Sequence, residues 1–271
     1  LFLYGPPGNG KTVLAKSIVR MLTGAIYIPY TVIVDGQIIR LYDELNHRRI
    51  QEAPTRSGGG LLSTSQPLDG RWVKVRRPEI VVGGELTMRN LDLIFDPISK
   101  TYEAPFQMKA NTGLFVIDDF GRQAMPPMDL LNRWIVPLEL RIDFLTLQTG
   151  KKIEIPFDQL IVFSTNLDPK DLVDEAFLRR IRHKLLIDFP DEKMYYQIMQ
   201  RECATRGIDL IPEAFVYLMQ NHYIGAHRNL RSCHPRDLLD QIVDIAGYFG
   251  ARPALSKQWI DAACDSYFSE L

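Results

Sequence analysis

The residues best suited to do chemistry stand near the start of the chain, where residues 5–12 read Gly-Pro-Pro-Gly-Asn-Gly-Lys-Thr. They fit the pattern G-x-x-x-x-G-K-[ST], in which glycines let the backbone curl so that several N–H groups face one phosphate. Lys11 is suited to bridge the β- and γ-phosphates, and the Thr12 hydroxyl to ligate magnesium. The pattern therefore predicts a site for ATP and Mg²⁺, with a glycine-rich turn and an exposed lysine as the alternative.

The predicted nucleotide contacts extend over this loop and into the element that follows it. We expect them from Gly5, Pro6, Pro7, Gly8, Asn9, Gly10, Lys11, Thr12 and Val13. A helix that begins at the end of the loop would add the positive end of its dipole to the phosphate site. Lys11 is expected to act in catalysis as well as in binding.

Two acids directly follow an apolar run at residues 114–117, and they form the second candidate site. Carboxylates at the end of a buried strand are costly unless something uses them, and a magnesium ion does. Asp118 is expected to hold the metal, directly or through water, and Asp119 to orient the attacking water as general base. Taken alone, the two acids also fit a solvated passage from strand to loop.

The spacing of hydrophobic residues predicts the strands and helices that hold these candidate site residues in place. Buried strands are expected at residues 1–4, 114–117 and 160–164, and further strands at 25–30 and 185–189. Helices are expected at 11–22 and 128–138, and hairpins at 31–41 and 142–155. Strands alternating with helices predict a parallel sheet covered on both faces. Residues 51–70 are rich in glycine, serine and proline, which predicts a mobile surface loop.

Beyond residue 190 the apolar residues follow helical spacing throughout. Helices are expected around residues 194–203, 215–219 and 238–245, and a fourth begins at Ser256 as its N-cap. We therefore predict a nucleotide-binding α/β core over residues 1–189, with an insertion at roughly 31–110. A small all-helical lid domain is predicted over residues 190–271.

Composition limits the other classes of function. The net charge is -1, so no global basic field favours nucleic acid. No apolar run approaches the roughly 20 residues that span a bilayer, and no signal peptide is evident. The three cysteines stand far apart, which excludes a CxxC site and favours a reducing compartment, so we expect a cytoplasmic protein. Since Leu1 is not methionine, we expect a piece of a longer chain.

The motifs and their order resemble those of the AAA+ ATPases over nearly the whole chain. Residues 5–12 look like the Walker A motif in its GPPGxGKT form, and residues 114–119 look like Walker B. The resemblance implies a P-loop NTPase fold, in which a three-layer αβα parallel sheet is followed by a small helical lid. It also implies ATP and Mg²⁺ as cofactors.

Three later positions match the family's polar sites. Asn166 ends the strand at 160–164 and looks like sensor 1, which touches the γ-phosphate and the attacking water. Arg180, beside Arg179 and Arg182, stands where the family places an arginine finger that reaches a neighbouring subunit. Arg236 opens a helix of the predicted lid and looks like sensor 2. The alternatives are a strand-ending turn for Asn166, a solvated basic patch around Arg180, and a local cap or ion pair for Arg236.

Two features depart from the commonest family pattern: the second acid of Walker B, and an interval between Walker A and Walker B that is longer than in a minimal AAA+ domain. Walker B usually reads Asp-Glu, whereas this chain has Asp118-Asp119, so the second acid is one methylene shorter and turnover is expected to be slow. The hairpin at residues 142–155, just before sensor 1, is similar to the pre-sensor-1 hairpin of the MoxR-like and magnesium-chelatase-like groups.

From these observations we predict an ATPase that binds and hydrolyses Mg-ATP at subunit interfaces of a homo-oligomeric ring, most simply a hexamer. The work would be done on a protein substrate or adaptor that the sequence does not identify. One alternative is a slow nucleotide-dependent assembly switch. Another is a nucleic-acid-associated motor, because residues 71–77 interleave basic and aromatic side chains. An edge strand with charged faces explains that stretch more simply, so nucleic acid is not the favoured partner.

Overall fold

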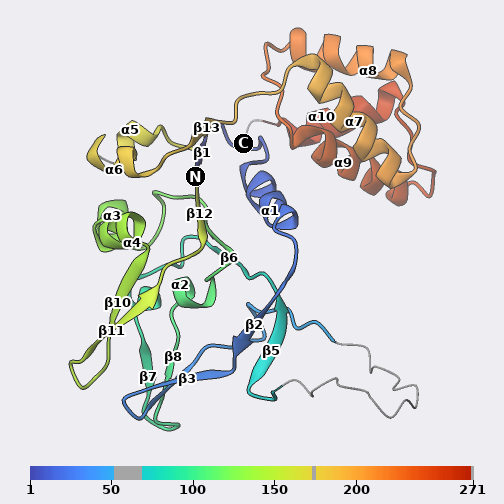
Figure 1. Ribbon diagram of the computed structural model, residues 1–271. Coiled ribbons are helices and arrows are strands. Elements are labelled where there is room, and N and C mark those ends of the chain that lie inside the picture. Colours follow the sequence, from blue (N-terminus) through green and yellow to red (C-terminus); the bar gives the residue numbers. More distant parts are fainter. Residues whose placement is uncertain (52–68, 173–174, 270–271) are drawn as a thin grey trace, which may run out of the picture. The chain divides into compact units, whose positions relative to one another are not determined.

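A five-stranded sheet organises the first part of the chain (Figure 1). In spatial order its strands are β13 (Lys184–Leu186), β1 (Phe2–Tyr4), β12 (Leu160–Thr165), β9 (Leu114–Ile117) and β6 (Glu79–Val82). The pairs β1–β12, β12–β9 and β9–β6 are parallel. All four residues of β9 are buried, as expected for a strand covered on both faces.

The computed structural model describes residues 1–51, 69–172 and 175–269 of the chain. The chain falls into two compact units. We call Leu1–Tyr4 with Thr12–Leu185 the sheet unit, and Gly5–Lys11 with Leu186–Leu271 the helical unit. The predicted domain division at residue 189 stays a prediction, because compactness alone does not establish independent folding. Most of the predicted loop at 51–70 lies outside the described residues.

Aromatic side chains fill the core of the sheet unit. Trp134 is fully buried, and its ring centroid lies 5.5 Å from that of Phe115 and 5.6 Å from that of Phe157. Phe163, on β12, stacks on Phe2 with centroids 5.8 Å apart. These contacts join the apolar face of the sheet to the residue that separates α3 (Pro127–Arg133) from α4 (Ile135–Leu140).

The single helix predicted at residues 128–138 is wrong, since the structure has two short helices there. Pro137 has no backbone N–H, so it cannot donate the helical hydrogen bond to the carbonyl of Arg133. The chain therefore interrupts the helix at Trp134 and begins α4 at the next residue. Two further short helices, α5 (Pro169–Leu172) and α6 (Glu175–Arg180), follow β12.

Both predicted hairpins are present. β3 (Thr31–Val34) pairs antiparallel with β4 (Gln37–Arg40) around Asp35 and Gly36. Both turn residues have positive φ, 49° and 74°, as a two-residue type I′ turn requires. β10 (Ile142–Thr146) pairs with β11 (Lys152–Pro156) in the same antiparallel manner.

Apart from β2, the remaining strands belong to the segment predicted as an insertion. The first hairpin continues through β8 (Thr101–Glu103) to β7 (Ile94–Asp96) as a four-stranded sheet. The strand predicted at 25–30 exists as β2 (Ala25–Pro29), but it pairs antiparallel with β5 (Trp72–Arg76) outside the parallel sheet. A 3₁₀ turn (Met88–Leu91) and α2 (Phe106–Lys109) complete this region.

Two strand predictions in the main sheet need correction. The last strand, predicted as an apolar run at 185–189, is instead the short β13, and Leu185 and Leu186 are 47% and 53% exposed. It stands last in the strand order, so only one of its edges is paired. β6 was not predicted, although Ile80-Val81-Val82 is an apolar β-branched run that ends at a glycine.

The helical unit contains the helices expected after residue 190 (Figure 1). They are α7 (Glu192–Arg206), α8 (Pro212–Leu218) with a π-helical continuation (Met219–Ile224), α9 (His234–Tyr248) and α10 (Lys257–Tyr267). The Ser256 side chain accepts a hydrogen bond from the Trp259 N–H, which is the N-cap predicted from the sequence. No helix of the described part of the chain is long and apolar enough to cross a membrane.

A chain of buried polar groups crosses the core of the helical unit. The Tyr195 and Tyr223 hydroxyl oxygens lie 2.6 Å apart, and the Tyr223 hydroxyl lies 3.0 Å from Nδ1 of His234. Burial, together with the nearby charges of Arg231 and Arg228, lowers the pKa of His234 from 6.5 to about 4. The folded unit therefore holds this imidazole in its neutral form at neutral pH.

We expect this histidine to make folding sensitive to acid. Between pH 6.5 and about 4 the unfolded chain binds a proton at His234 that the folded chain does not, so stability falls as the pH falls. Above pH 6.5 both states are neutral there and the contribution is constant. Thermal melts across this range should show a steeper loss for the wild type than for His234→Gln, whose amide does not titrate. Parallel curves would contradict the assignment.

Candidate nucleotide-binding site

The loop at residues 5–12 leaves β1 and enters α1 (Lys11–Met21), the context expected of a phosphate loop. Gly5, Gly8 and Gly10 have φ values of 133°, 80° and 83°, which side chains rarely adopt. A Cβ on Gly5 would stand 2.3 Å from the Ile187 carbonyl oxygen. Glycine is therefore required at position 5 both by its backbone angle and by its surroundings.

Lys11 is turned back over its own loop. Its Nζ donates hydrogen bonds to the carbonyl oxygens of Gly5 and Pro6, each at 2.9 Å, and the residue is only 6% exposed. Two neutral backbone carbonyls therefore hold the ammonium group of Lys11. A charged acceptor such as a phosphate oxygen would form stronger hydrogen bonds with it and displace them.

The loop is also fastened within the helical unit. The Gly8 carbonyl oxygen accepts from the Cys233 N–H at 2.8 Å, and the Asn9 Oδ1 accepts from the Ser232 N–H at 3.2 Å. The Nδ2 of Asn9 is buried and has no acceptor among the described residues. A buried donor that lacks an acceptor fits a site that receives an oxygen-rich ligand such as a phosphate.

The sheet unit brings Thr12 and Asp118 together. The Thr12 hydroxyl lies 2.8 Å from Oδ2 and 3.0 Å from Oδ1 of Asp118. Thr12 stands in the first turn of α1, and Asp118 directly follows β9. A hydroxyl and a carboxylate are oxygen ligands of the kind that Mg²⁺ prefers, so these two residues fit that ion.

Asp119 and Asn166 meet where the neighbouring strands β9 and β12 end. The Asn166 Nδ2 donates to Oδ1 of Asp119 at 3.3 Å. Asp119 has a φ of 48°, a left-handed conformation that aspartate tolerates better than most residues. The Gln123 Nε2 donates to the backbone carbonyls of Asp118 and Asp119, at 3.0 and 3.1 Å, which fixes the turn. Both side chains belong to the carboxyl-end edge of the sheet, where ligands of open α/β sheets bind.

The two arginines and Val13 lie in less specific settings. The Arg180 Nε donates to Oε1 of Glu139 at 2.6 Å, at the end of α6. The Arg236 Nε donates to Oδ1 of its neighbour Asp237 at 2.8 Å, in the first turn of α9. Val13 is 67% exposed on α1. The structure thus shows ion pairs for both arginines. A local pair is the alternative weighed for Arg236, whereas the alternative weighed for Arg180 was a solvated basic patch.

Several residues that contact the candidate site are not marked by any sequence motif. Gln123 has no motif that marks it, and its role follows only from the turn after β9. Ser232 and Cys233 are separated from the loop by most of the chain, so no local pattern indicates their contact with it. Gly8 is the one related signal, since a Cβ at this position would stand 2.7 Å from the Cys233 Sγ.

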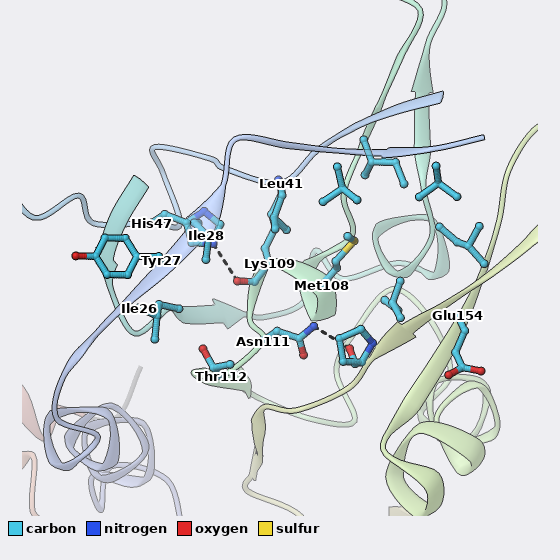
Figure 2. A pocket seen from close by; sticks show the side chains of 16 residues that line it. Ile26, Tyr27, Ile28, Leu41, His47, Met108, Lys109, Asn111, Thr112 and Glu154 are labelled. Carbon is cyan, nitrogen blue, oxygen red and sulfur yellow. Dashed lines mark hydrogen bonds between the residues drawn. The ribbon is translucent and has the colours of Figure 1, made fainter. Parts of the chain in front are cut away.

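A separate apolar cavity of about 590 Å³ lies in the sheet unit, and Figure 2 shows its lining. Aliphatic side chains from β2, β3, β4 and β11 surround it. At its rim the His47 Nε2 lies 3.0 Å from the Lys109 carbonyl oxygen, and the Asn111 Nδ2 donates to the Pro156 carbonyl oxygen at 2.8 Å. None of the site residues predicted from the sequence lines this cavity.

Comparison with known proteins supports the fold. Residues 191–266 match a family described as a domain of unknown function, DUF8689. No curated protein matches the chain in sequence. Among solved structures, NtrX from Brucella abortus in complex with ADP is similar with a TM-score of 0.53 and 12% identity, over 98% of this chain and 50% of NtrX. NtrX in complex with ATP gives a TM-score of 0.51 and 13% identity, over 99% and 52%.

This chain spans about half the length of the NtrX structures. At such low identity the similarity shows the fold alone. It confirms the predicted fold class, an α/β fold in which a parallel sheet is followed by a helical part.

Proposed function

We propose that the chain is an ATPase of the AAA+ type, which binds Mg-ATP through residues 5–12 and hydrolyses it. The observation that carries the proposal is the pairing of the Thr12 hydroxyl with the Asp118 carboxylate at 2.8 to 3.0 Å. Thr12 ends a loop of phosphate-binding type, and Asp118 follows a buried central strand. NtrX, which shares the fold, was solved with ADP and with ATP, and this supports a nucleotide as the ligand.

In this proposal the loop residues bind the phosphates. Lys11 exchanges its bonds to the Gly5 and Pro6 carbonyls for phosphate oxygens, which carry more charge. The buried Asn9 amide provides a further donor. Thr12 and Asp118 would hold Mg²⁺, which when bound neutralises charge on the phosphates. Val13 would contribute through its backbone, since its side chain faces solvent.

For hydrolysis, Asp119 is proposed as the general base and Asn166 as the residue that orients it. Their contact at 3.3 Å supports this division of roles, because the amide holds one carboxylate oxygen and leaves the other for water. Arg180 would act on a neighbouring subunit's site, and Arg236 would report the γ-phosphate to the helices around it. Both would first leave their present partners, Glu139 and Asp237.

Action in trans by Arg180 requires head-to-tail contacts, which close into a ring when the rotation allows. We propose a homo-oligomeric ring, most simply a hexamer, that remodels a protein substrate in the cytoplasm. The β10–β11 hairpin directly precedes β12, and this order supports a place in the group with a pre-sensor-1 hairpin.

A second candidate function is a slow nucleotide-dependent switch. Asp119 is one methylene shorter than glutamate, and its carboxylate is already bonded to Asn166. A general base whose side chain is short, and one of whose carboxylate oxygens already accepts from Asn166, favours slow ATP turnover. Slow turnover suits a switch that controls assembly better than it suits a motor.

One experiment tests the proposal and separates the two candidates. Phosphate release is measured with ATP and Mg²⁺, with EDTA added as the metal-free control, under single-turnover and steady-state conditions. Release that needs Mg²⁺ and recurs over many turnovers is the expected result for a motor. A single slow turnover with retained product indicates the switch. Absence of any Mg²⁺-dependent release, in protein shown to be folded and assembled, would overturn the assignment of an ATPase.

A further inference from the structure

The outer face of the β2–β5 pair combines aromatic and basic side chains. On β5 the alternate residues Val73 and Val75 are buried, whereas Trp72, Lys74 and Arg76 point the other way. Trp72 is 44% exposed. This alternation places one aromatic and two cationic side chains in a row on one face of a strand.

β2 adds a second aromatic ring to this face. Tyr27 pairs in register with Lys74, whose Nζ lies 5.6 Å from the centroid of the tyrosine ring. Tyr27 is 44% exposed, and the alternation of side chains along β2 places it on the face opposite Ile26 and Ile28. The β2–β5 pair thus has an inner apolar face and an outer face that carries Tyr27, Trp72, Lys74 and Arg76.

Residues 48–50 extend this surface along the other edge of β5. The Arg76 N–H donates to the Arg48 carbonyl oxygen at 3.0 Å, and the Ile50 N–H donates to the Lys74 carbonyl oxygen at 2.9 Å. Arg49 forms a bridge with Val75. The register therefore places Arg48 beside Arg76 on the outer face, whereas Arg49 stands opposite Val75.

Two grooves meet at Ile50 on this part of the sheet unit. The first, of about 600 Å³, is lined by Lys16, Arg20, Arg48, Arg76 and Arg77, with Glu79 as the one acid among its lining residues. The second, of about 420 Å³, is lined by Arg49, Lys74, Tyr30 and Trp72. Its one acid, Asp69, is paired with Arg71 at 2.6 Å. Positive charge therefore exceeds negative charge along both grooves, in a chain whose net charge is -1.

Most of these cations are available for a ligand. Within the described part of the chain, no carboxylate forms an ion pair with Lys16, Arg48 or Arg76. Arg77 differs, because it donates to the carbonyl oxygens of Thr23 and Thr112 and so serves the fold. Lys16, Arg48 and Arg76, which have no carboxylate partner among the described residues, fit a ligand that supplies several negative charges in a row.

We propose that the outer face of β2–β5 and the two adjoining grooves bind single-stranded nucleic acid. Flat bases stack on Trp72 and Tyr27, and the phosphates pair with Arg48, Arg76, Lys16 and Arg20. Exposed rings between cations favour a single strand over a duplex, whose bases are already stacked. The exposed rings also favour a nucleic acid over an acidic peptide, because the carboxylates of such a peptide would pair with the cations but would not stack on Trp72 and Tyr27.

The test is fluorescence anisotropy with a labelled oligothymidylate of about 20 nucleotides, titrated with the full chain in the absence of ATP. Raising the salt from about 50 to about 200 mM should weaken binding about 50-fold, because about four phosphate contacts contribute roughly 0.7 each to the logarithmic salt slope. The Arg48→Ala/Arg76→Ala variant should lower that slope by about 1.4. Trp72→Ala should weaken binding about tenfold with the slope unchanged, and Trp72→Tyr should restore it.

The matched control is Arg89→Ala/Arg252→Ala, which removes two exposed arginines elsewhere on the chain and should bind as the wild type does. Thermal melts verify that each variant folds. The proposal is overturned by absence of binding at low salt, by equal losses in the two double variants, or by a duplex or polyaspartate that binds more tightly than the single strand. Repeating the titration with Lys11→Ala keeps the result independent of the proposed ATPase, since this surface does not include Lys11.

Discussion

Replacing Asp119 with asparagine is expected to slow ATP hydrolysis by about 10²–10⁴-fold while ATP and Mg²⁺ remain bound. The asparagine has nearly the same size and keeps an oxygen for the Asn166 amide, which now lies 3.3 Å from the carboxylate. It cannot take a proton from water. Steady-state phosphate release measures the rate, and titration with a fluorescent ATP analogue measures the affinity.

Two further variants make this result specific. Asp209→Asn removes an exposed carboxylate of the helical unit and should leave the rate unchanged. Asp119→Glu lengthens the side chain by one methylene, and faster turnover would show that reach limits the wild type. If Asp119→Asn hydrolyses ATP at the wild-type rate, the base lies elsewhere.

The second large effect is expected at Arg180. If its guanidinium acts on a neighbouring subunit, Arg180→Ala should bind ATP normally but lose turnover by about 10³-fold or more. Mixing Arg180→Ala with Asp119→Asn should restore activity, because roughly a quarter of head-to-tail interfaces then pair an intact Asp119 with an intact Arg180. The measurement is the ATPase rate of each variant and of the equal mixture, at a concentration where the wild type is assembled.

The ion pair between Arg180 and Glu139 supplies the control. If Arg180 served only this contact, at 2.6 Å, then Glu139→Gln would lose as much turnover as Arg180→Ala. We expect Glu139→Gln to retain turnover. Arg179→Ala, which removes a side chain 78% exposed on the same helix, should also retain it. No recovery on mixing, with assembly verified by light scattering, would refute action in trans and turn attention to Arg182 or Arg179.

Sequence patterns located the parts of the fold whose signals are local. β9 and β12 are continuous apolar runs that end in polar residues, and the turn at Asp35-Gly36 contains the residues that its backbone angles need. Capping by Ser256 likewise depends only on its neighbours. Each of these features is set by interactions within a few residues, and a single sequence contains that information.

Elements that depend on distant partners were missed or misplaced. β2 was expected in the parallel sheet, but it pairs with β5, and the hydrophobic pattern of a strand does not say which strand lies beside it. β6 is a clear apolar run, but its pairing with β9 joins strands that a long segment separates in the sequence. The apolar run alone does not predict that pairing. The helix break at Trp134 depended on the missing N–H of Pro137, which a purely hydrophobic reading overlooks.

For the candidate site, the motifs predicted which residue types stand together but not all of their contacts. The carboxyl ends of parallel strands share one edge, so the approach of Asp119 to Asn166 was foreseeable. The bonds from Ser232 and Cys233 to the loop were not, because they join opposite ends of the chain through backbone groups that every residue has.

The central claim is that residues 5–12 bind ATP, and titration of Lys11→Ala with a fluorescent ATP analogue tests it most directly. Lys11 faces two phosphates in the proposed complex, and charge-assisted hydrogen bonds contribute roughly 1.5–3 kcal/mol each, so affinity should fall by about 10²-fold or more. Lys193→Ala, an exposed lysine of α7, should bind as the wild type does. Unchanged affinity in a folded Lys11→Ala protein would show that this loop is not the phosphate site.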